Sequence, residues 1–165
     1  MTRLTRTLAA MLALIAPVAP AAAQEVLDGG WVRLGDLGVT IEVPAPFASQ
    51  FSPPSIAEDA LGGTRVNYVS DISFVEFSVQ RYPGALNARE VAGLAYPPAE
   101  STVTYEVDKP DLGVVSGYVD ERIYYSACKR PGTGTGALHC FDLVWPQSYR
   151  ALIDTHVARI LRSLG

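Results

Sequence analysis

Two cysteines constrain the fold of this 165-residue chain more than any other feature. Cys128 and Cys140 are the chain's only cysteines, and a Pro/Gly-rich stretch, residues 131–136, separates two apolar segments that contain them. A hairpin would place the two side chains opposite each other, where facing Cα atoms lie about 4.5 Å apart, within the range of a disulfide. The sequence therefore predicts a disulfide that clips a hairpin. Closing so short a loop should stabilise the domain by about 2–3 kcal/mol.

The first residues indicate export, and export favours a persistent disulfide. Arg3 and Arg6 precede a short apolar run that ends in three alanines, as in a secretory signal peptide cleaved after Ala23. The alternative is a membrane anchor, but a membrane span needs about 20 apolar residues and two prolines interrupt this run. We expect residues 1–23 to be a cleavable signal peptide and the protein to be periplasmic or secreted by a bacterium.

Removing the signal leaves 142 residues, enough for one domain with a substantial core. Residues 24–30 are expected to be a short leader and residues 31–165 a single α+β domain. The remaining 11 basic and 17 acidic residues give a net charge of −6 with neutral histidine. Nucleic acids and anionic lipids select clustered cations, so this composition argues against both as partners. We also expect no stable membrane insertion after the signal is cleaved.

The pattern of apolar residues predicts mostly antiparallel strands. Period-two alternation indicates strands over residues 31–34, 37–43, 64–70, 73–81, 102–107, 112–119, 122–128 and 137–145. In the fourth of these, Val75, Phe77 and Val79 share one face, and Glu76, Ser78 and Gln80 share the other. Residues 52–63 contain Pro-Pro and Gly-Gly pairs and are expected to be a loop.

Two helices are predicted. Asn87 and Glu90 form a capping box, and Leu86 and Val91 occupy the positions of a hydrophobic staple, so a short helix should start there and end before a Pro-Pro pair. A longer helix should start near Pro146. Its apolar stripe comprises Tyr149, Leu152, Ile153, His156, Val157, Ile160, Leu161 and Leu164.

Two sequence motifs resemble a catalytic motif and a nucleotide-binding motif, but neither lies in the structural context that its function requires. Ser126 and Lys129 match S-x-x-K of penicillin-recognising enzymes. That chemistry needs both side chains on one helical face, whereas residues three apart in a strand point to opposite faces. The glycines of residues 132–136 resemble a nucleotide-binding loop, but such loops open a helix, and this stretch joins two strands. We interpret it as a hairpin tip.

The two histidines are also expected to be structural. His156 lies in the apolar stripe of the last helix. If the thiols were reduced, Cys128, His139, Cys140 and Asp142 would form a candidate metal cluster. In a strand, however, the side chain of His139 would point to the face opposite Cys140 and Asp142. We assign no catalytic, cofactor-binding or metal-binding residue, and expect no cofactor. The one site assignment is the disulfide between Cys128 and Cys140.

Three segments carry a resemblance: Tyr124-Tyr125-x-x-Cys128, Cys140-Phe141-x-x-Val144-Trp145-Pro146, and the closing helix to Ser163-Leu164. On these, the chain resembles a group of small uncharacterised exported proteins of alpha-proteobacteria, and its order of elements is similar to the Mog1/PsbP-like fold. The resemblance implies an α+β fold in which a short helix and a long C-terminal helix pack on a curved, mainly antiparallel sheet. It also implies a non-catalytic adaptor, because relatives of that fold bind partners. Fold alone does not decide function.

Two functions follow as hypotheses. The first is an exported binding or accessory domain for a protein partner or a small ligand of the cell envelope, with Tyr68, Tyr118, Tyr124 and Tyr125 as candidates to line a face. Half-buried sheet positions are the alternative for these tyrosines, because aromatic residues favour strands. The second hypothesis is a small periplasmic hydrolase whose site is assembled only in three dimensions.

Overall fold

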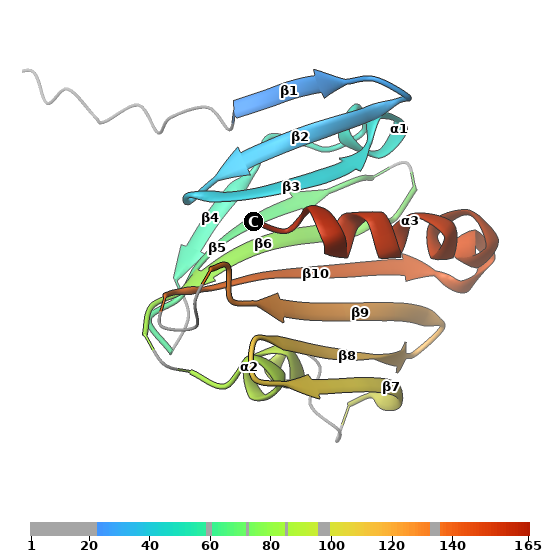
Figure 1. Ribbon diagram of the computed structural model, residues 1–165. Helices are drawn as coiled ribbons and strands as arrows, with labels where there is room; N and C mark the ends of the chain where they lie inside the picture. Colours follow the sequence, from blue (N-terminus) through green and yellow to red (C-terminus); the bar gives the residue numbers. More distant parts are fainter. Residues whose placement is uncertain (1–22, 59–60, 72, 85, 96–99, 133–135) are drawn as a thin grey trace, which may run out of the picture.

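Antiparallel β-structure dominates the computed structural model, which describes residues 23–58, 61–71, 73–84, 86–95, 100–132 and 136–165 (Figure 1). A smaller sheet has the order β1 (Ala23–Leu27), β2 (Trp31–Asp36), β3 (Val39–Pro44). The larger sheet has seven antiparallel strands, which lie in the order β4 (Ser55–Glu58), β5 (Thr64–Val69), β6 (Glu76–Tyr82), β10 (Leu138–Pro146), β9 (Arg122–Lys129), β8 (Leu112–Val119), β7 (Thr102–Lys109).

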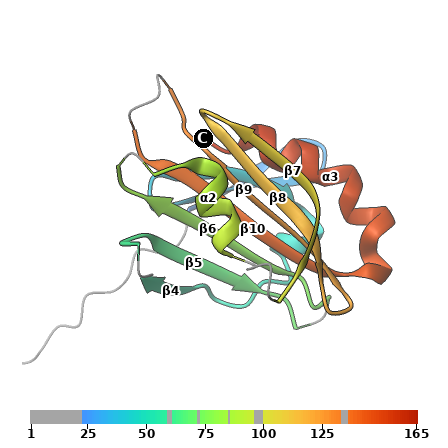
Figure 2. The same cartoon turned by 90° about the horizontal axis from the view of Figure 1, so that it is seen from below.

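The helices lie on opposite faces of the larger sheet. The C-terminal helix α3 (Arg150–Ser163), preceded by a 3-10 turn η1 (Gln147–Tyr149), lies across one face next to the smaller sheet (Figure 1). Helix α2 (Ala88–Leu94) lies on the other face, as the second view shows (Figure 2). A single helical turn, α1 (Ala45–Ala48), follows β3. The predicted α+β class and antiparallel sheet, with its short and C-terminal helices, are therefore confirmed.

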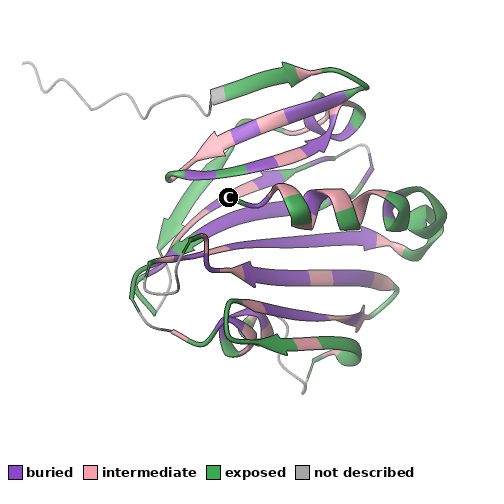
Figure 3. Ribbon diagram, in the orientation of Figure 1, coloured by how far each residue is buried: buried purple, intermediate pink, exposed green. Residues whose placement is uncertain are grey.

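The main core lies between the larger sheet, α3 and the smaller sheet. Ile153 and Ile160 of α3, Ile41 of β3, and Phe77 and Phe141 of the larger sheet are all at most 2% exposed. Alternation along each strand sends every second side chain into this layer. The strands at the centre of the larger sheet are accordingly almost wholly buried, whereas β7 and β4 at its edges are exposed (Figure 3).

A second, smaller core forms beneath α2. Ala88, Val91 and Ala92 of the helix are buried against the sheet cluster that includes Val115. Gly113 permits this close approach, since a Cβ atom there would lie 2.2 Å from the carbonyl carbon of Ala88. The predicted N-cap is confirmed: the side-chain oxygen of Asn87 accepts a hydrogen bond from the amide of Glu90 at 3.0 Å.

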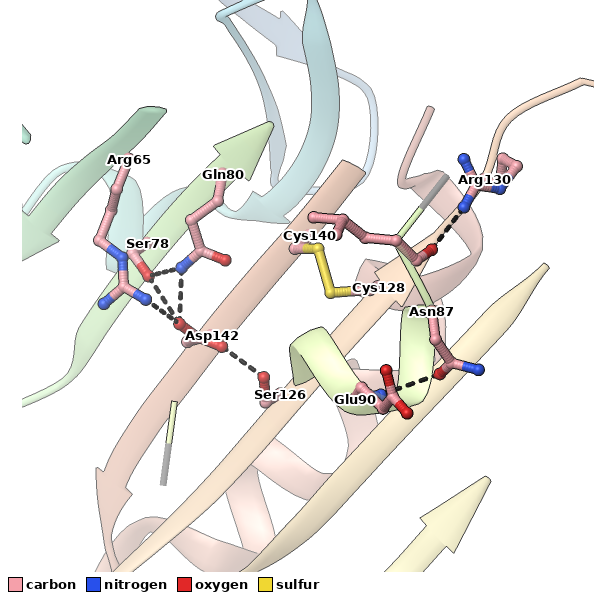
Figure 4. Close-up of a disulfide and its surroundings, with 11 residues drawn as sticks. Arg65, Ser78, Gln80, Asn87, Glu90, Ser126, Cys128, Arg130, Cys140 and Asp142 are labelled. Carbon is pink, nitrogen blue, oxygen red and sulfur yellow. Dashed lines mark hydrogen bonds and ion pairs between the residues drawn. A yellow bond between two sulfur atoms is a disulfide. The ribbon is translucent and has the colours of Figure 1, made fainter. Parts of the chain in front are cut away.

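The predicted disulfide is present in the β9–β10 hairpin. Cys128 and Cys140 are register partners, and their Cα atoms lie 4.0 Å apart. Both residues are 1% exposed, because the bond lies in the core beneath α2 (Figure 4). Arg130 supports the same end of the hairpin by donating hydrogen bonds to the carbonyl oxygens of Gly84 and Leu86 at 3.0 and 2.6 Å.

The predicted loop over residues 52–63 was wrong in part. Strand β4 lies where a loop was expected; all four of its residues are exposed, so it lacks the burial pattern that reveals a strand, and backbone pairing with β5 holds it. Strand β1 lies in the expected leader and is held likewise by β2. The predicted signal peptide, apart from Ala23, lies outside the described residues. Within the described ranges, no helix combines the length and apolar character required to span a membrane.

The helix stripe was predicted in part. Ile153, Ile160 and Leu164 are buried, and Val157 and Leu161 pack at the edge of the main core. Leu152 and Tyr149 were expected in the stripe but are 50% and 37% exposed. The reason is that α3 begins after η1, beyond the ends of the strands, so its first turn has less of the sheet to pack against (Figure 1).

Candidate functional site

A groove lined by aromatic residues lies beside α3, on the same face of the larger sheet. Its floor and one wall contain Tyr105, Tyr118, Tyr125 and Trp145, and its helix wall contains Arg150, Asp154 and Val157. Its volume is about 270 Å³. We call this surface the aromatic groove. It lies where the layer formed by α3 and the smaller sheet ends, towards the β7 edge of the larger sheet (Figure 1).

Strand register brings the aromatic side chains together. Tyr105 of β7 and Tyr125 of β9 both pair with Ser116 of β8, and so share its face of the sheet. Tyr118 lies two residues further along β8 and projects to the same side. On the opposite wall, Arg150 and Asp154 are separated by one helical turn and lie on the same side of α3.

The groove's two charged groups neutralise each other. The Nε of Arg150 donates a hydrogen bond to Oδ2 of Asp154 at 3.2 Å, and its Nη1 donates to the hydroxyl of Tyr118 at 3.4 Å. Both charged side chains are about half exposed or more, at 62% and 47%. An exposed pair of this kind contributes little stability, about 0–1 kcal/mol, so both partners can readily exchange it for contacts with a ligand.

Tyr125 supplies an uncharged phenol to the groove. Its ring stacks on Phe141 with centroids 5.9 Å apart and planes 17° apart. Burial, with a smaller contribution from Tyr105, raises the pKa of Tyr125 to about 12. The hydroxyl is therefore protonated at neutral pH, and it can both donate and accept a hydrogen bond.

Trp145 contributes an apolar wall and an unused donor. Its side chain is 2% exposed, and its indole Nε1 has no hydrogen-bond partner among the described residues. An indole nitrogen can only donate. Buried donors in native proteins are usually paired, so this one is unusual within the part of the chain that the structure describes.

A second polar feature lies on the opposite face, centred on the buried carboxylate of Asp142 (Figure 4). Its Oδ2 accepts hydrogen bonds from Gln80 at 2.5 Å, Arg65 at 3.1 Å and Ser78 at 3.3 Å, and its Oδ1 accepts one from Ser126 at 2.5 Å. We call these five residues the Asp142 cluster. Four donors satisfy a buried charge that would otherwise be costly. Ser78 and Gln80 share the polar face predicted for this strand, and both are buried.

Cavities flank the Asp142 cluster on two sides. One, of about 320 Å³, is mainly polar and is also lined by Asn67 and Glu76. The other, of about 290 Å³, is mainly apolar and is bounded by Val91 of α2. Arg65 and Asp142 line both cavities, so their ion pair separates the two.

The S-x-x-K residues do not meet. Ser126 bonds to Asp142 on the α2 face, while the Nζ of Lys129 donates to the carbonyl oxygen of Leu164 at 2.9 Å on the α3 face. This confirms the prediction that the two side chains point to opposite faces of the sheet. The glycine-rich tip, residues 133–135, lies outside the described residues.

Neither histidine joins the Asp142 cluster. His139 faces away from Asp142, and burial lowers the pKa of its imidazole. Its Nδ1 is buried with no hydrogen-bond partner in the described ranges. His156 makes an edge-on contact with Trp31 at 5.3 Å between ring centroids. Among the described residues, no three His, Cys, Asp or Glu side chains are grouped so as to hold a metal ion.

Sequence reasoning identified part of the aromatic groove. Of the four tyrosines suggested for a binding face, Tyr118 and Tyr125 line the groove. Tyr68 lies in the main core and Tyr124 lies in the core beneath α2. Sequence analysis did not identify Trp145 as a residue of the groove, because its position indicated only the end of a strand.

The polar residues were missed for another reason. Arg150 and Asp154 lie outside the predicted apolar stripe of the last helix, and only the crossing of α3 over the sheet places them at a groove. Asp142 was considered only with the cysteines, although four polar residues in the middle of otherwise apolar strands were a usable signal. Comparison with protein-family models and with curated protein sequences gives no match for this chain.

Proposed function

We propose that this protein is an exported, non-catalytic binding or accessory domain that holds a small ligand, or a side chain of a protein partner, in the aromatic groove. The observation that carries the proposal is the placement of four aromatic residues opposite a compensated Arg150–Asp154 pair. Small-molecule sites combine mostly apolar, aromatic walls with a few convergent polar groups. The aromatic groove has this composition.

The volume and rigidity of the groove support the same proposal. At about 270 Å³, the groove lies near the lower end of the range of about 300–1,000 Å³ for ligand sites. Its aromatic residues come from strands of one hydrogen-bonded sheet, so binding orders few side chains and costs little conformational entropy. A preformed site of this size suits a ligand of one or two rings.

Export is the expected setting for this function. The disulfide between Cys128 and Cys140 favours an oxidising compartment, which supports a periplasmic or secreted location. The signal peptide over residues 1–23 remains a prediction from the sequence. The partner or ligand would then belong to the cell envelope or its surroundings.

The Asp142 cluster is the observation that favours the alternative, a small hydrolase. Ser126 and Asp142 form a hydroxyl–carboxylate pair beside two cavities. A serine nucleophile needs a base of suitable pKa, usually histidine, between it and the carboxylate. Here the serine bonds the carboxylate directly, and His139 faces the other side of the sheet. This geometry supports a structural role for the cluster better than a catalytic one.

We also propose that the fold is Mog1/PsbP-like. The order of elements supports this assignment: strands with the single helical turn α1 among them, the short helix α2, a run of antiparallel strands and a long terminal helix. Relatives of that fold act by binding partners, in line with a non-catalytic role.

A groove-filling variant tests the proposed function. Val157 lines the groove, whereas its exposed neighbour Ala158 does not. A library of small fragments, screened by ligand-observed NMR, should yield molecules that bind the wild type and Ala158→Trp but not Val157→Trp. Circular dichroism would verify that both variants fold. Fragments that bind Val157→Trp undiminished, or a library with no binders, would contradict the proposal.

A further inference from the structure

We infer that the aromatic groove selects an uncharged, hydroxylated six-membered ring, that is, a pyranose sugar unit, over ionic or purely apolar rings. The inference rests on the proposed function, since it names the ligand class of the same groove. Three properties carry it: the balance of charge, the exposed aromatic surface, and the mixture of donors and acceptors.

Charge balance favours a neutral ligand over an ionic one. Arg150 and Asp154 are the only charged residues among those described that line the groove, and they pair with each other. A cation or an anion entering the groove would lose hydration and find no uncompensated counter-charge. A neutral ligand incurs no such cost.

The aromatic surface fits a ring with C–H groups on one face. Tyr105 is 54% exposed and offers its ring to the groove, beside the half-buried Tyr118 and Tyr125. The face of an aromatic ring carries partial negative charge. The C–H groups on the face of a pyranose carry partial positive charge, so the two surfaces attract and exclude water together.

The polar groups fit hydroxyls, which both donate and accept. Arg150 is a donor only, the Asp154 carboxylate is an acceptor only, and the Tyr125 hydroxyl, neutral at physiological pH, is both. Adjacent hydroxyls on one ring edge can satisfy Arg150 and Asp154 at the same time. A hydrocarbon ring can satisfy neither.

The test compares six probes on the full chain by calorimetry. They are the methyl glycosides of glucose, galactose and mannose, then cyclohexanol, tetramethylammonium and benzoate. At least one glycoside should bind about tenfold or more tightly than the other three probes. Maltotriose forms a further arm if the glucoside binds: tighter binding than the monosaccharide indicates a sugar chain as the source, and equal binding indicates a free sugar or a chain end.

Matched tyrosine variants locate the binding. Tyr105→Ala should weaken the glycoside about twofold to tenfold, from the loss of ring contact. Tyr149→Ala, at an exposed tyrosine that does not line the groove, should leave the affinity unchanged. Equal or tighter binding of cyclohexanol, tetramethylammonium or benzoate, or no binding of any glycoside, overturns the sugar inference. The groove would still stand as a binding site if fragments bind it and Val157→Trp abolishes their binding.

Discussion

The hydroxyl of Ser126 donates a 2.5 Å hydrogen bond to the carboxylate of Asp142, across neighbouring strands in the interior of the protein. Both residues are at most 5% exposed. Gln80, Ser78 and Arg65 complete the shell around the same carboxylate. The pair therefore belongs to a buried polar network that fixes how β5, β6, β10 and β9 lie beside one another.

Replacing Asp142 by asparagine should destabilise the protein strongly. The amide removes the negative charge that Arg65 pairs with and places a donor among four donors. We expect a loss of about 3 kcal/mol in the free energy of unfolding by urea, in the range for a broken buried ion pair. Asp154→Asn, the same change at a half-exposed site, should cost at most about 0.5 kcal/mol. Equal effects at the two positions would contradict a structural role for the cluster.

Loss of the disulfide should lower stability without changing the fold. The bond closes a loop between residues 12 apart, so Cys128→Ala with Cys140→Ala should reduce the free energy of unfolding by about 2–3 kcal/mol. Reduced wild type should match the double variant. Mass spectrometry of the protein without reductant should show one intramolecular disulfide, and free thiols would refute this account of the hairpin.

Stability should fall at alkaline pH because of Tyr125. Its pKa rises from 10.0 to about 12 in the folded state, so the unfolded chain loses this proton first. The contribution is fully present below pH 10 and is lost as the pH rises from 10 to about 12. Tyr125→Phe removes this titration, so urea unfolding curves of variant and wild type should diverge over that interval. Parallel pH dependence would mean that the phenol is not buried as described.

Gly113 should be irreplaceable, whereas a glycine in α2 should not. A Cβ at Gly113 would lie 2.2 Å from backbone atoms of Ala88 and Arg89, so Gly113→Ala must displace the helix. We expect a cost above about 2 kcal/mol and faster amide hydrogen exchange in α2. At Gly93, within α2, the nearest atom would be 3.6 Å away, so Gly93→Ala should be neutral or stabilise by up to about 1 kcal/mol. Similar costs would argue against close packing of α2 on β8.

Local pattern predicted the elements that bury one face. Strand β8 has the predicted bounds, and Asn87 starts α2 as its capping box indicates. These succeed because alternation and capping act within a few residues of the chain. Strand β4 failed because an exposed edge strand is held by pairing alone, with no side-chain pattern to show it.

The candidate site depends on contacts between distant segments. Tyr105 and Arg150 are 45 positions apart, and only the order of strands and the crossing of α3 place them at one groove. Strand alternation did show which residues could not meet, as for Ser126 and Lys129. Sequence pattern therefore excluded false sites more readily than it located the groove.

The aromatic groove is the central claim, and the two indole N–H signals of the protein test it most directly. The chain has two tryptophans: Trp145 lines the groove, and Trp31 packs beneath the guanidinium of Arg159, 4.0 Å from its ring centroid. Trp31→Phe assigns the signals in a two-dimensional proton–nitrogen NMR spectrum. Titration with a bound fragment or glycoside should shift the Trp145 signal and leave that of Trp31 in place. Saturable binding that shifts Trp31, or neither signal, would contradict the account.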